Sequence, residues 1–411
     1  MIRLISREQC SACGACQNIC PVDSITMKED DYGYIFPHID EKSCIECNKC
    51  VETCKQIDSL SKNIPRISYA SFSKSKSIRF QAAAGGAVYE FAKFFLENGG
   101  VVYGCVQKNY KTFRIERITS FERLPDILNS KLVQSEIGYS FRNVKDDLEN
   151  NLNVLFTGLP CQVGGLRAFL DKDYKNLLTV DIGCLGVVPV KMLEDQIRSY
   201  NEIKKYKTDE IKVQFRWKYY KNDEVSTIFG LRTLACGDNK TEIIKEEENK
   251  INHYKRCYDN IMRDSCYSCR YPSLERFSDI TVANFWQIGK KIPSSFKFLN
   301  GVSNVMPNTE KGKEYFELIK NNISFEVYES CEAAKYDGCL KSHRKKDIRR
   351  DDFLKRYRKK GFIKAAKTVY PIKYFEKDNT QGVKYLTKRI LSKYINKSPF
   401  LIKIYKYLFK K

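Results

Sequence analysis

The sequence lacks the features of a membrane-spanning protein and of common hydrolases. Its 411 residues contain no run of about 18 apolar residues, so we expect no membrane-spanning helix. The N-terminus has no apolar signal segment, which predicts a reducing, cytoplasmic compartment. Histidine occurs only at positions 38, 253 and 343, so there is no HExxH motif and no basis for a Ser-His-Asp set. Neither a Walker A motif nor a GxGxxG fingerprint occurs.

Acidic residues are scarce only at the C-terminal end. The whole chain has 72 Lys and Arg against 50 Asp and Glu, a net charge of +22. Residues 341–411 contain 24 basic and 5 acidic residues, a net of +19, which leaves +3 for residues 1–340. The apolar fraction of 42% and the chain length allow two to three domains with a real core.

Cysteine, by contrast, is abundant, and eight of the 17 cysteines form two matched runs. The runs are Cys10-x2-Cys13-x2-Cys16-x3-Cys20-Pro21 and Cys44-x2-Cys47-x2-Cys50-x3-Cys54-Lys55, repeated with a period of 34 residues. In two-cluster ferredoxins the first three cysteines of such a run bind one 4Fe–4S cluster and the fourth binds the other cluster. The spacing therefore predicts a ferredoxin-like domain over residues 1–60 that relays single electrons.

The predicted ligands are divided between the two runs. One cluster is assigned to Cys10, Cys13, Cys16 and Cys54, and the other to Cys44, Cys47, Cys50 and Cys20. Zinc is the alternative, but zinc sites favour two Cys pairs separated by a longer loop. Lys55 replaces the proline that follows the first run, which changes the turn after the ligand and not the ligand itself.

The body of the chain alternates between predicted strands and helices. After a polar linker over 61–80, we expect a helix over 87–97, followed by a strand over 101–106. A second unit has a strand over 153–157, a helix over 162–170 and a strand over 177–181, which predicts an α/β core. Gly85 and Gly86 precede the first helix, where backbone N–H groups can bind a phosphate; tight backbone packing is the alternative interpretation.

Several motifs, in order, resemble one known family. They are Ala84–Ala87, Gly99–Gly104, Ser130–Ser135, Leu155–Gln162, Leu178–Asp181, Cys266-x2-Cys269-Arg270-Tyr271, Ser278–Thr281 and Phe285-Trp286. This set is similar to the family of coenzyme F420 hydrogenase/dehydrogenase β-subunits, and the resemblance covers roughly residues 1–325. The resemblance implies an α+β fold with a small ferredoxin-like N-terminal domain and an α/β flavin-binding body over 81–340. The charge and apolar spacing of residues 341–411 add a helical basic tail.

What the family implies is an iron–sulfur flavoprotein oxidoreductase with FAD. Electrons would pass between the clusters and a redox partner, which can be a ferredoxin, a deazaflavin or a nicotinamide carrier. Bacterial members point to a sugar-linked substrate in surface polysaccharide biosynthesis. Gly85, Gly86 and Asn284 are the expected cofactor-binding residues. Ala84 and Asn284 depart from the family's Ser and Asp, which keeps open a flavin-free 4Fe–4S adaptor that serves a partner enzyme.

Four further cysteines are candidate ligands of a third 4Fe–4S cluster. They are Cys161, Cys184, Cys266 and Cys269, and the family resemblance favours a cluster in the body. Cys161 starts a predicted helix, whose N-terminus favours a thiolate. A structural zinc, or a redox-active Cys161 with unrelated partners, are the alternatives. The other cysteines, at positions 105, 236, 257, 331 and 339, lack ligand spacing and are expected to be small buried apolar residues.

The basic tail predicts attachment to an anionic membrane surface. Within 384–397, Leu386, Ile390 and Leu391 share one helical face, and lysines occupy the other. A short aromatic helix is expected over 400–409. Such helices bind the inner membrane face reversibly, which would make the cytoplasmic enzyme peripheral. A solvated face packed on the body is one alternative; nucleic acid is not expected, because no binding motif accompanies the charge.

Overall fold

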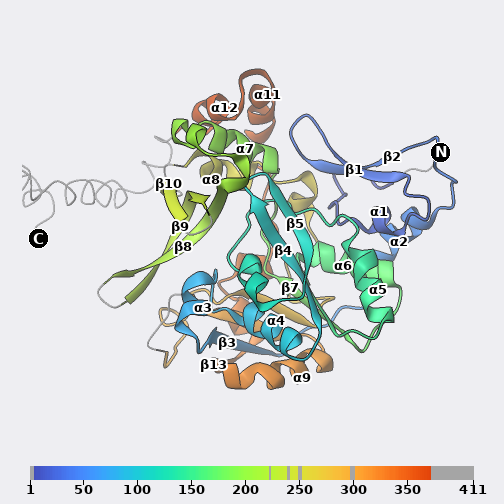
Figure 1. Ribbon diagram of the computed structural model, residues 1–411, viewed down its shortest axis with the longest axis vertical. Helices are drawn as coiled ribbons and strands as arrows, with labels where there is room; N and C mark the ends of the chain where they lie inside the picture. Colours follow the sequence, from blue (N-terminus) through green and yellow to red (C-terminus); the bar gives the residue numbers. More distant parts are fainter. Residues whose placement is uncertain (1–3, 222–223, 238–240, 249–251, 297–300, 372–411) are drawn as a thin grey trace, which may run out of the picture.

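The structure is a computed structural model that describes residues 4–371, apart from 222–223, 238–240, 249–251 and 297–300. It is an α+β fold, as the sequence predicted, and it contains three sheets (Figure 1). A two-stranded sheet belongs to the N-terminal domain, an eight-stranded mixed sheet forms the centre of the body, and a three-stranded sheet lies beside it.

The eight-stranded sheet contains both parallel and antiparallel pairs. In spatial order its strands are β13 (Ile323–Glu329), β3 (Ile67–Ser73), β12 (Ser303–Pro307), β11 (Ile280–Asn284), β7 (Leu177–Ile182), β6 (Val154–Gly158), β4 (Val101–Asn109) and β5 (Thr112–Ile118). The pairs β4–β6, β6–β7 and β7–β11 are parallel, and the others are antiparallel. Strand β6 is buried along its whole length, as expected for a parallel strand covered on both faces.

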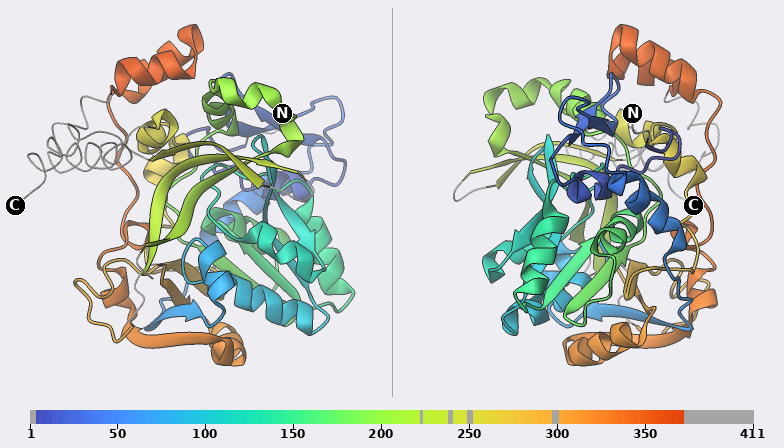
Figure 2. Two further views of the ribbon diagram at one scale, coloured as in Figure 1. Left: turned by 60° about the vertical axis from the view of Figure 1, so that its left-hand side comes forward. Right: turned by 90° about the vertical axis from the view of Figure 1, so that its right-hand side faces the viewer.

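Helices cover both faces of this sheet (Figures 1 and 2). On one face, α4 (Ala87–Glu97), α9 (Glu310–Ile319) and η1 (Phe121–Ile127) share an apolar core with β4, β6, β7, β11 and β12. On the other face, α5 (Ser140–Glu149) and α6 (Pro160–Leu170) pack on β4, β6 and β7. The predicted helix over 87–97 is confirmed, and it buries Phe91 and Phe95 as its spacing indicated.

The three-stranded antiparallel sheet belongs to a second core. Its strands are β8 (Ile211–Lys221), β9 (Glu224–Cys236) and β10 (Thr241–Glu248). The helices around it are α7 (Val190–Arg198), η2 (Asn201–Lys205), η3 (Thr208–Glu210), α8 (His253–Cys257), η4 (Tyr258–Asn260), α11 (Arg350–Lys360) and α12 (Phe362–Val369). Leu231 of β9, Tyr254 of α8 and Phe353 of α11 are fully buried in this shared core.

The N-terminal domain contains both cysteine runs. Its elements are α1 (Ala15–Ile19), β1 (Ile25–Glu29), β2 (Ile35–Ile39) and α2 (Lys49–Ser59). Helices α1 and α2 contact α6 of the body, and the β1–β2 hairpin reaches toward α11. Arg358 of α11 forms an ion pair with Asp31 in the hairpin turn, and Tyr357 packs near Tyr32.

Two predicted segments differ from the structure. Residues 61–80 were expected to be a linker, but β3 lies inside this range and pairs with both β12 and β13. Its alternating serines misled the prediction, because Ser68, Ser71 and Ser73 are buried in the sheet. Helix α3 (Lys76–Gln81) follows. The tail expected from residue 341 also begins with packed structure, since α11 and α12 bury Phe353, Tyr357 and Phe362.

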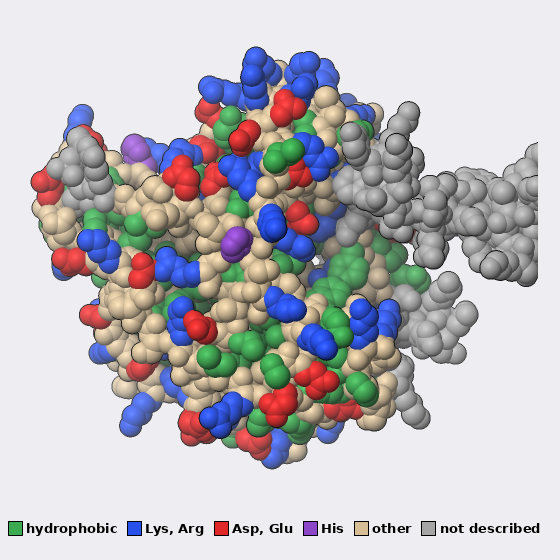
Figure 3. Space-filling model, turned by 180° about the vertical axis from the view of Figure 1, so that it is seen from behind, with side chains coloured by type: hydrophobic (Ala, Val, Ile, Leu, Met, Phe, Trp, Pro, Cys, Tyr) green, Lys and Arg blue, Asp and Glu red, His purple; other side chains and the backbone are tan. Residues whose placement is uncertain are grey.

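The remaining short elements complete the body. They are η5 (Asp264–Ser268), η6 (Lys320–Asn322), α10 (Ser330–Ala334) and η7 (Gly338–Leu340). The charge run at the C-terminal end is partly neutralised. Arg356 pairs with Asp352, and Figure 3 shows acidic side chains beside the basic ones at the top of the molecule, where α11 and α12 lie. The predicted amphipathic helices over 384–397 and 400–409 lie outside the described residues. Within the described ranges, every helix is too short or too polar to cross a membrane.

Candidate functional site

The two cysteine runs fold into equivalent loops. Each loop holds two residues in the left-handed backbone region just before its helix. They are Ala12 (φ 52°) and Gly14 (φ 81°) before α1, and Glu46 (φ 54°) and Asn48 (φ 59°) before α2. These pairs are 34 residues apart, the period of the sequence repeat. The two loops therefore share the same backbone bend, and non-glycine residues adopt it at a steric cost.

The structure brings together the cysteines predicted for the first cluster. The thiols of Cys10, Cys13 and Cys54 lie within electrostatic range of Cys16, and all four line one cavity of about 320 Å³. Cys54 comes from α2, so the fourth member of the second run reaches the first group. Cys10 is buried and Cys16 is partly buried. We name these four the inner group.

The cysteines predicted for the second cluster also lie together, nearer the surface. Cys20, Cys44, Cys47 and Cys50 line one small pocket with Ile25 and Ile39. Cys20 is buried, with its Sγ 3.2 Å from Ser24 Oγ, whereas Cys47 is exposed. We name these four the outer group.

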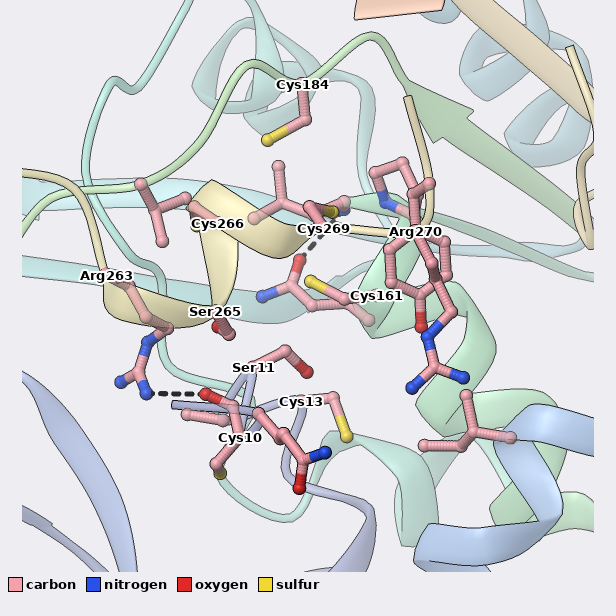
Figure 4. A pocket seen from close by; sticks show the side chains of 18 of the residues that line it. Cys10, Ser11, Cys13, Cys161, Cys184, Arg263, Ser265, Cys266, Cys269 and Arg270 are labelled. Carbon is pink, nitrogen blue, oxygen red and sulfur yellow. Dashed lines mark hydrogen bonds between the residues drawn. The ribbon is translucent and has the colours of Figure 1, made fainter. Parts of the chain in front are cut away.

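The four candidate cysteines of the body line the same cavity as the inner group. Cys161 begins α6, Cys184 follows β7, and Cys266 and Cys269 lie in or directly after η5. Figure 4 shows their side chains on one side of the cavity and those of Cys10 and Cys13 on the other. The Cys184 Sγ accepts a hydrogen bond of 3.3 Å from the Gly186 N–H. We name these four the body group.

Each of the three groups offers four cysteine thiols, which is the donor set of a 4Fe–4S cluster. A zinc ion holds each sulfur at about 2.3 Å, so its ligands converge closely. Among the described residues, no set of three or more His, Cys, Asp or Glu side chains is close enough to hold one ion. A four-iron cluster is larger than one ion and binds four thiolates around a shared centre, and the cavity that the inner and body groups line has a volume of about 320 Å³.

Burial and mutual proximity raise the pKa values of the thiols in the body group. Burial raises the pKa of Cys161, and the neighbouring thiols of Cys184 and Cys269 raise it further. Burial, followed by Cys266, raises the pKa of Cys184 to about 12. At Cys161 desolvation therefore outweighs the stabilisation of a thiolate that the N-terminus of α6 offers. Iron would supply the missing positive charge.

The inner and body groups are held at close range by Gly165 of α6. An added Cβ at Gly165 would lie 2.9 Å from Cys13 Sγ, so only glycine lets the first cysteine loop approach α6 this closely. Cys13 is also among the thiols that act electrostatically on Cys161. The dicluster loop and the body thus share one wall of the cavity.

The predicted flavin residues lie together near the ends of β11 and β12. The Gly85 N–H donates to Ser303 Oγ at 2.9 Å, and an added Cβ would lie 2.2 Å from the Ser71 carbonyl oxygen. Gly85 therefore packs tightly, and its N–H is not available to a phosphate. Gly86 (φ 92°) caps α4, whose first-turn N–H groups remain candidates for anion contact. Asn284 ends β11 and accepts a hydrogen bond of 2.8 Å from Arg216 Nη1.

Two basic residues of β8 that the sequence analysis missed face this region. Arg216 donates to the Ala83 carbonyl at 3.0 Å, and Lys218 donates to the Ala84 carbonyl at 2.8 Å. Neither forms an ion pair with any described carboxylate, and Arg216 Nε is buried without a partner in the described structure. Burial lowers the pKa of Arg216 to about 10, and burial together with Arg216 lowers that of Lys218 to about 8. Such uncompensated cations fit an anionic ligand.

An aromatic pair lies next to these cations. Phe229 and Trp286 stack with ring centroids 6.2 Å apart, and the Arg216 guanidinium lies 4.6 Å from the Phe229 ring centre. Trp286 is 37% exposed, so part of its ring is open to a ligand. Basic side chains can contact phosphates, and exposed rings can contact a flat heterocycle. No motif marked β8 in the sequence, because Arg216 and Lys218 look like ordinary strand charges there.

The comparisons with known proteins cover both parts of the chain. Residues 152–332 match the family described as the C terminus of the coenzyme F420 hydrogenase/dehydrogenase beta subunit. Residues 9–59 match the 4Fe-4S dicluster domain. The first match contains the whole body group, and the second contains the inner and outer groups.

Three individual proteins are similar to this chain. One subunit of the F(420)H(2) dehydrogenase of Methanosarcina mazei is 21% identical over 336 residues, 78% of this chain and 85% of that protein. One subunit of the Na(+)-translocating ferredoxin:NAD(+) oxidoreductase complex of Acetobacterium woodii is 40% identical over 48 residues, only 12% of this chain and 13% of that protein. A chain of the F420-reducing [NiFe] hydrogenase complex from Methanosarcina barkeri aligns with a TM-score of 0.43 and 16% identity over 75% of this chain and 92% of that one.

Proposed function

Because residues 152–332 belong to the family of coenzyme F420 hydrogenase/dehydrogenase β-subunits and residues 9–59 to the 4Fe–4S dicluster domain, we propose that this protein is an iron–sulfur flavoprotein oxidoreductase. The observation that carries the proposal is the cavity of about 320 Å³ whose wall is shared by the inner group and the body group. When bound, 4Fe–4S clusters transfer single electrons, and FAD converts between one-electron and two-electron chemistry.

The order of the three cysteine groups supports a path for electrons. The outer group includes the exposed Cys47, where a redox partner can approach. The inner group comes second along the path, because Cys16 of the inner group and Cys50 of the outer group lie within electrostatic range of each other. The body group comes next, with Cys13 beside Cys161. The three groups would thus form a series of ligand sets that leads from the surface into the body.

The flavin half of the proposal rests on the cations of β8. A buried lysine and a partly buried arginine without described carboxylate partners are costly unless an anion lies beside them. In the resembling family a carboxylate stands at the position of Asn284. The amide here accepts a hydrogen bond from Arg216 without neutralising it, which leaves more positive charge for a pyrophosphate. Trp286 and Phe229 would then contact the flat rings.

The end of the path is close to the proposed flavin site. Gly183 directly precedes Cys184, and an added Cβ at Gly183 would lie 2.9 Å from the Ala283 Cβ on β11. Ala283 in turn precedes Asn284, the residue that contacts Arg216. One pair of adjacent strands, β7 and β11, therefore joins the body group to the cations of β8. The substrate would be a hydride carrier or a sugar-linked compound.

The decisive experiment is anaerobic purification of the full chain followed by cofactor extraction. An oxidoreductase of this type releases FAD and contains about twelve iron atoms per chain, four for each cysteine group. A flavin-free protein with intact clusters would instead support the adaptor alternative, in which the chain carries electrons for a partner enzyme. Turnover with reduced deazaflavin, NADH and reduced ferredoxin would then identify the electron donor.

A further inference from the structure

One buried charge between the inner and body groups has no role in the proposed electron path. Arg263 is only 1% exposed and lines the shared cavity. Its Nη1 donates to the Cys10 carbonyl oxygen at 2.9 Å, the contact drawn in Figure 4. Its own carbonyl oxygen accepts a hydrogen bond of 3.0 Å from the Cys266 N–H. One residue therefore bonds to both cysteine-bearing segments.

The other donors of Arg263 are all satisfied by neutral groups. Its Nε and Nη2 donate to Gln134 Oε1 at 3.1 and 3.0 Å, and Nη2 also donates to the Ile35 carbonyl. The guanidinium lies 4.4 Å from the centre of the Phe36 ring. Each guanidinium nitrogen thus has a hydrogen-bond partner, yet no described carboxylate pairs with Arg263. Its charge stays uncompensated by the described protein groups.

Comparison with the other arginines of the same cavity makes this unusual. Arg276 lies 3.7 Å from the buried carboxylate of Asp181, and Arg270 forms an ion pair with Asp58. Both are neutralised by acidic side chains. A charge as deeply buried as that of Arg263 destabilises a protein unless an opposite charge lies nearby. The opposite charge must come from something that the cavity holds.

Cysteine thiols, which become anionic when they bind iron as thiolates, lie within its reach. Cys10, Cys266 and Cys161 all lie within electrostatic range of the guanidinium. These residues belong to the inner and body groups, and no member of the outer group is among them. A 4Fe–4S cluster with four thiolates is net anionic, and it becomes more so when it gains an electron. A nearby cation therefore favours the reduced state.

We propose that Arg263 is a positioning residue that supplies the shared counter-charge of the inner and body clusters and raises the reduction potentials of both. This inference rests on the proposed function, since it requires clusters at the two cysteine groups. It predicts that loss of the Arg263 charge lowers the reduction potentials of the inner and body centres more than that of the outer centre, whose cysteines are not among its main electrostatic partners.

Arg142 offers a matched control within the same chain. It too reaches from the body to a cysteine run, donating to the Cys20 carbonyl at 2.6 Å and to the Asn18 carbonyl at 2.7 Å. However, Arg142 is partly exposed and pairs with Asp23 at 2.7 Å, so its charge is compensated. Removing it tests the docking contact without removing an uncompensated charge.

The test is an anaerobic redox titration of the full chain, monitored by electron paramagnetic resonance, for wild type, Arg263→Met, Arg263→Lys and Arg142→Met. The outer signal is identified by its loss in Cys47→Ser. In Arg263→Met the reduction equilibrium of the inner and body centres should become at least tenfold less favourable, which is about 59 mV for a one-electron couple. In Arg263→Met the reduction potential of the outer centre should shift less than half as much. In Arg263→Lys and Arg142→Met the potentials of the inner and body centres should also shift less than half as much.

Two results would overturn the proposal. Unchanged potentials in an iron-replete Arg263→Met protein would show a structural role only, and an equal shift in Arg263→Lys would assign the effect to hydrogen-bond geometry. If Arg263→Met fails to assemble, iron retention by Arg263→Lys supports the counter-charge, and iron loss overturns it. The iron and FAD content of wild type reports separately on the proposed function. If the wild type contains only about eight iron atoms, so that the body group holds no cluster, the reduction potential of the inner centre still tests the role of Arg263.

Discussion

The carbonyl oxygen of Cys10 accepts a hydrogen bond of 2.9 Å from Arg263, although the two residues are 253 positions apart in the chain. This contact joins the first cysteine loop to the loop that carries Cys266 and Cys269. Together with the packing of Cys13 on Gly165, it sets the separation between the dicluster domain and the body. Measurements of iron, flavin, stability and membrane binding can test whether that arrangement works as proposed.

The iron content should report the body group directly. The double variant Cys266→Ser with Cys269→Ser removes two of its four thiols, so iron should fall from about twelve to about eight atoms per chain. Iron and acid-labile sulfide are measured on anaerobically purified protein. The control is Cys236→Ser with Cys331→Ser, two cysteines outside all three groups. Unchanged iron in the first variant would refute a third cluster.

Flavin binding should depend on the cations of β8. Changing Arg216 or Lys218 to Met should weaken FAD binding about tenfold or more each, because a charged hydrogen bond contributes about 1.5–3 kcal/mol. FAD released per chain, and its dissociation constant by fluorescence, give the measurement. Lys204→Met and Lys207→Met remove exposed lysines as the control. Full FAD content in both β8 variants would show that the flavin binds elsewhere in the protein.

Close packing at Gly165 should stabilise the contact between the dicluster domain and the body. In Gly165→Ala the new methyl group would lie 2.9 Å from Cys13 Sγ, so the loop must shift. We expect the free energy of unfolding to fall by about 1–3 kcal/mol, the usual cost of overpacking. Gly164→Ala is the control, because its methyl group meets Tyr271 and Phe277 at 3.2 Å or more. Anaerobic denaturation should show that Gly165→Ala is less stable than Gly164→Ala. Equal stability of the two variants would contradict the packing argument.

The membrane prediction is best tested with a chain that ends at Pro371. This form keeps α11 and α12, whose Phe353 and Phe362 are buried in the second core, so it should stay folded. Full-length protein should float with anionic vesicles and not with neutral ones, and raised salt should weaken binding through screening. The shortened form should stay in solution. Equal flotation of the two forms, or none by either, would reject a membrane role for residues 384–411.

His253 should give the stability a dependence on pH. Burial, with Arg256 and Lys367 nearby, lowers the pKa of His253 to about 4, whereas an unfolded histidine titrates near 6.5. Below pH 6.5 the unfolded state binds the proton first, so stability present at pH 7 falls as the pH drops toward 4. His253→Gln should flatten that slope in anaerobic melts at pH 7.5 and 5.5. An unchanged slope in His253→Gln would exclude His253 as a source of the pH dependence.

The sequence by itself determined the parts of this protein that depend on local pattern. The 34-residue repeat predicted two equivalent loops, and the backbone angles of Ala12 and Glu46 confirm that they fold alike. Apolar spacing predicted α4, and buried runs predicted β6 and β7. These features form because neighbouring residues decide them. The linker over 61–80 failed because serines that look solvent-exposed in the sequence are buried once β3 enters the sheet.

Only the tertiary structure decided how distant segments meet. Cys161, Cys184 and Cys266 come from three separate segments of the chain, and nothing local indicates that they line one cavity with Cys10 and Cys13. The roles of Arg216 and Arg263 depend on enclosure without a carboxylate partner, a property that exists only after folding. A charge in a sequence is ordinary; the same charge enclosed by protein requires an anion, and that requirement points to what the protein binds.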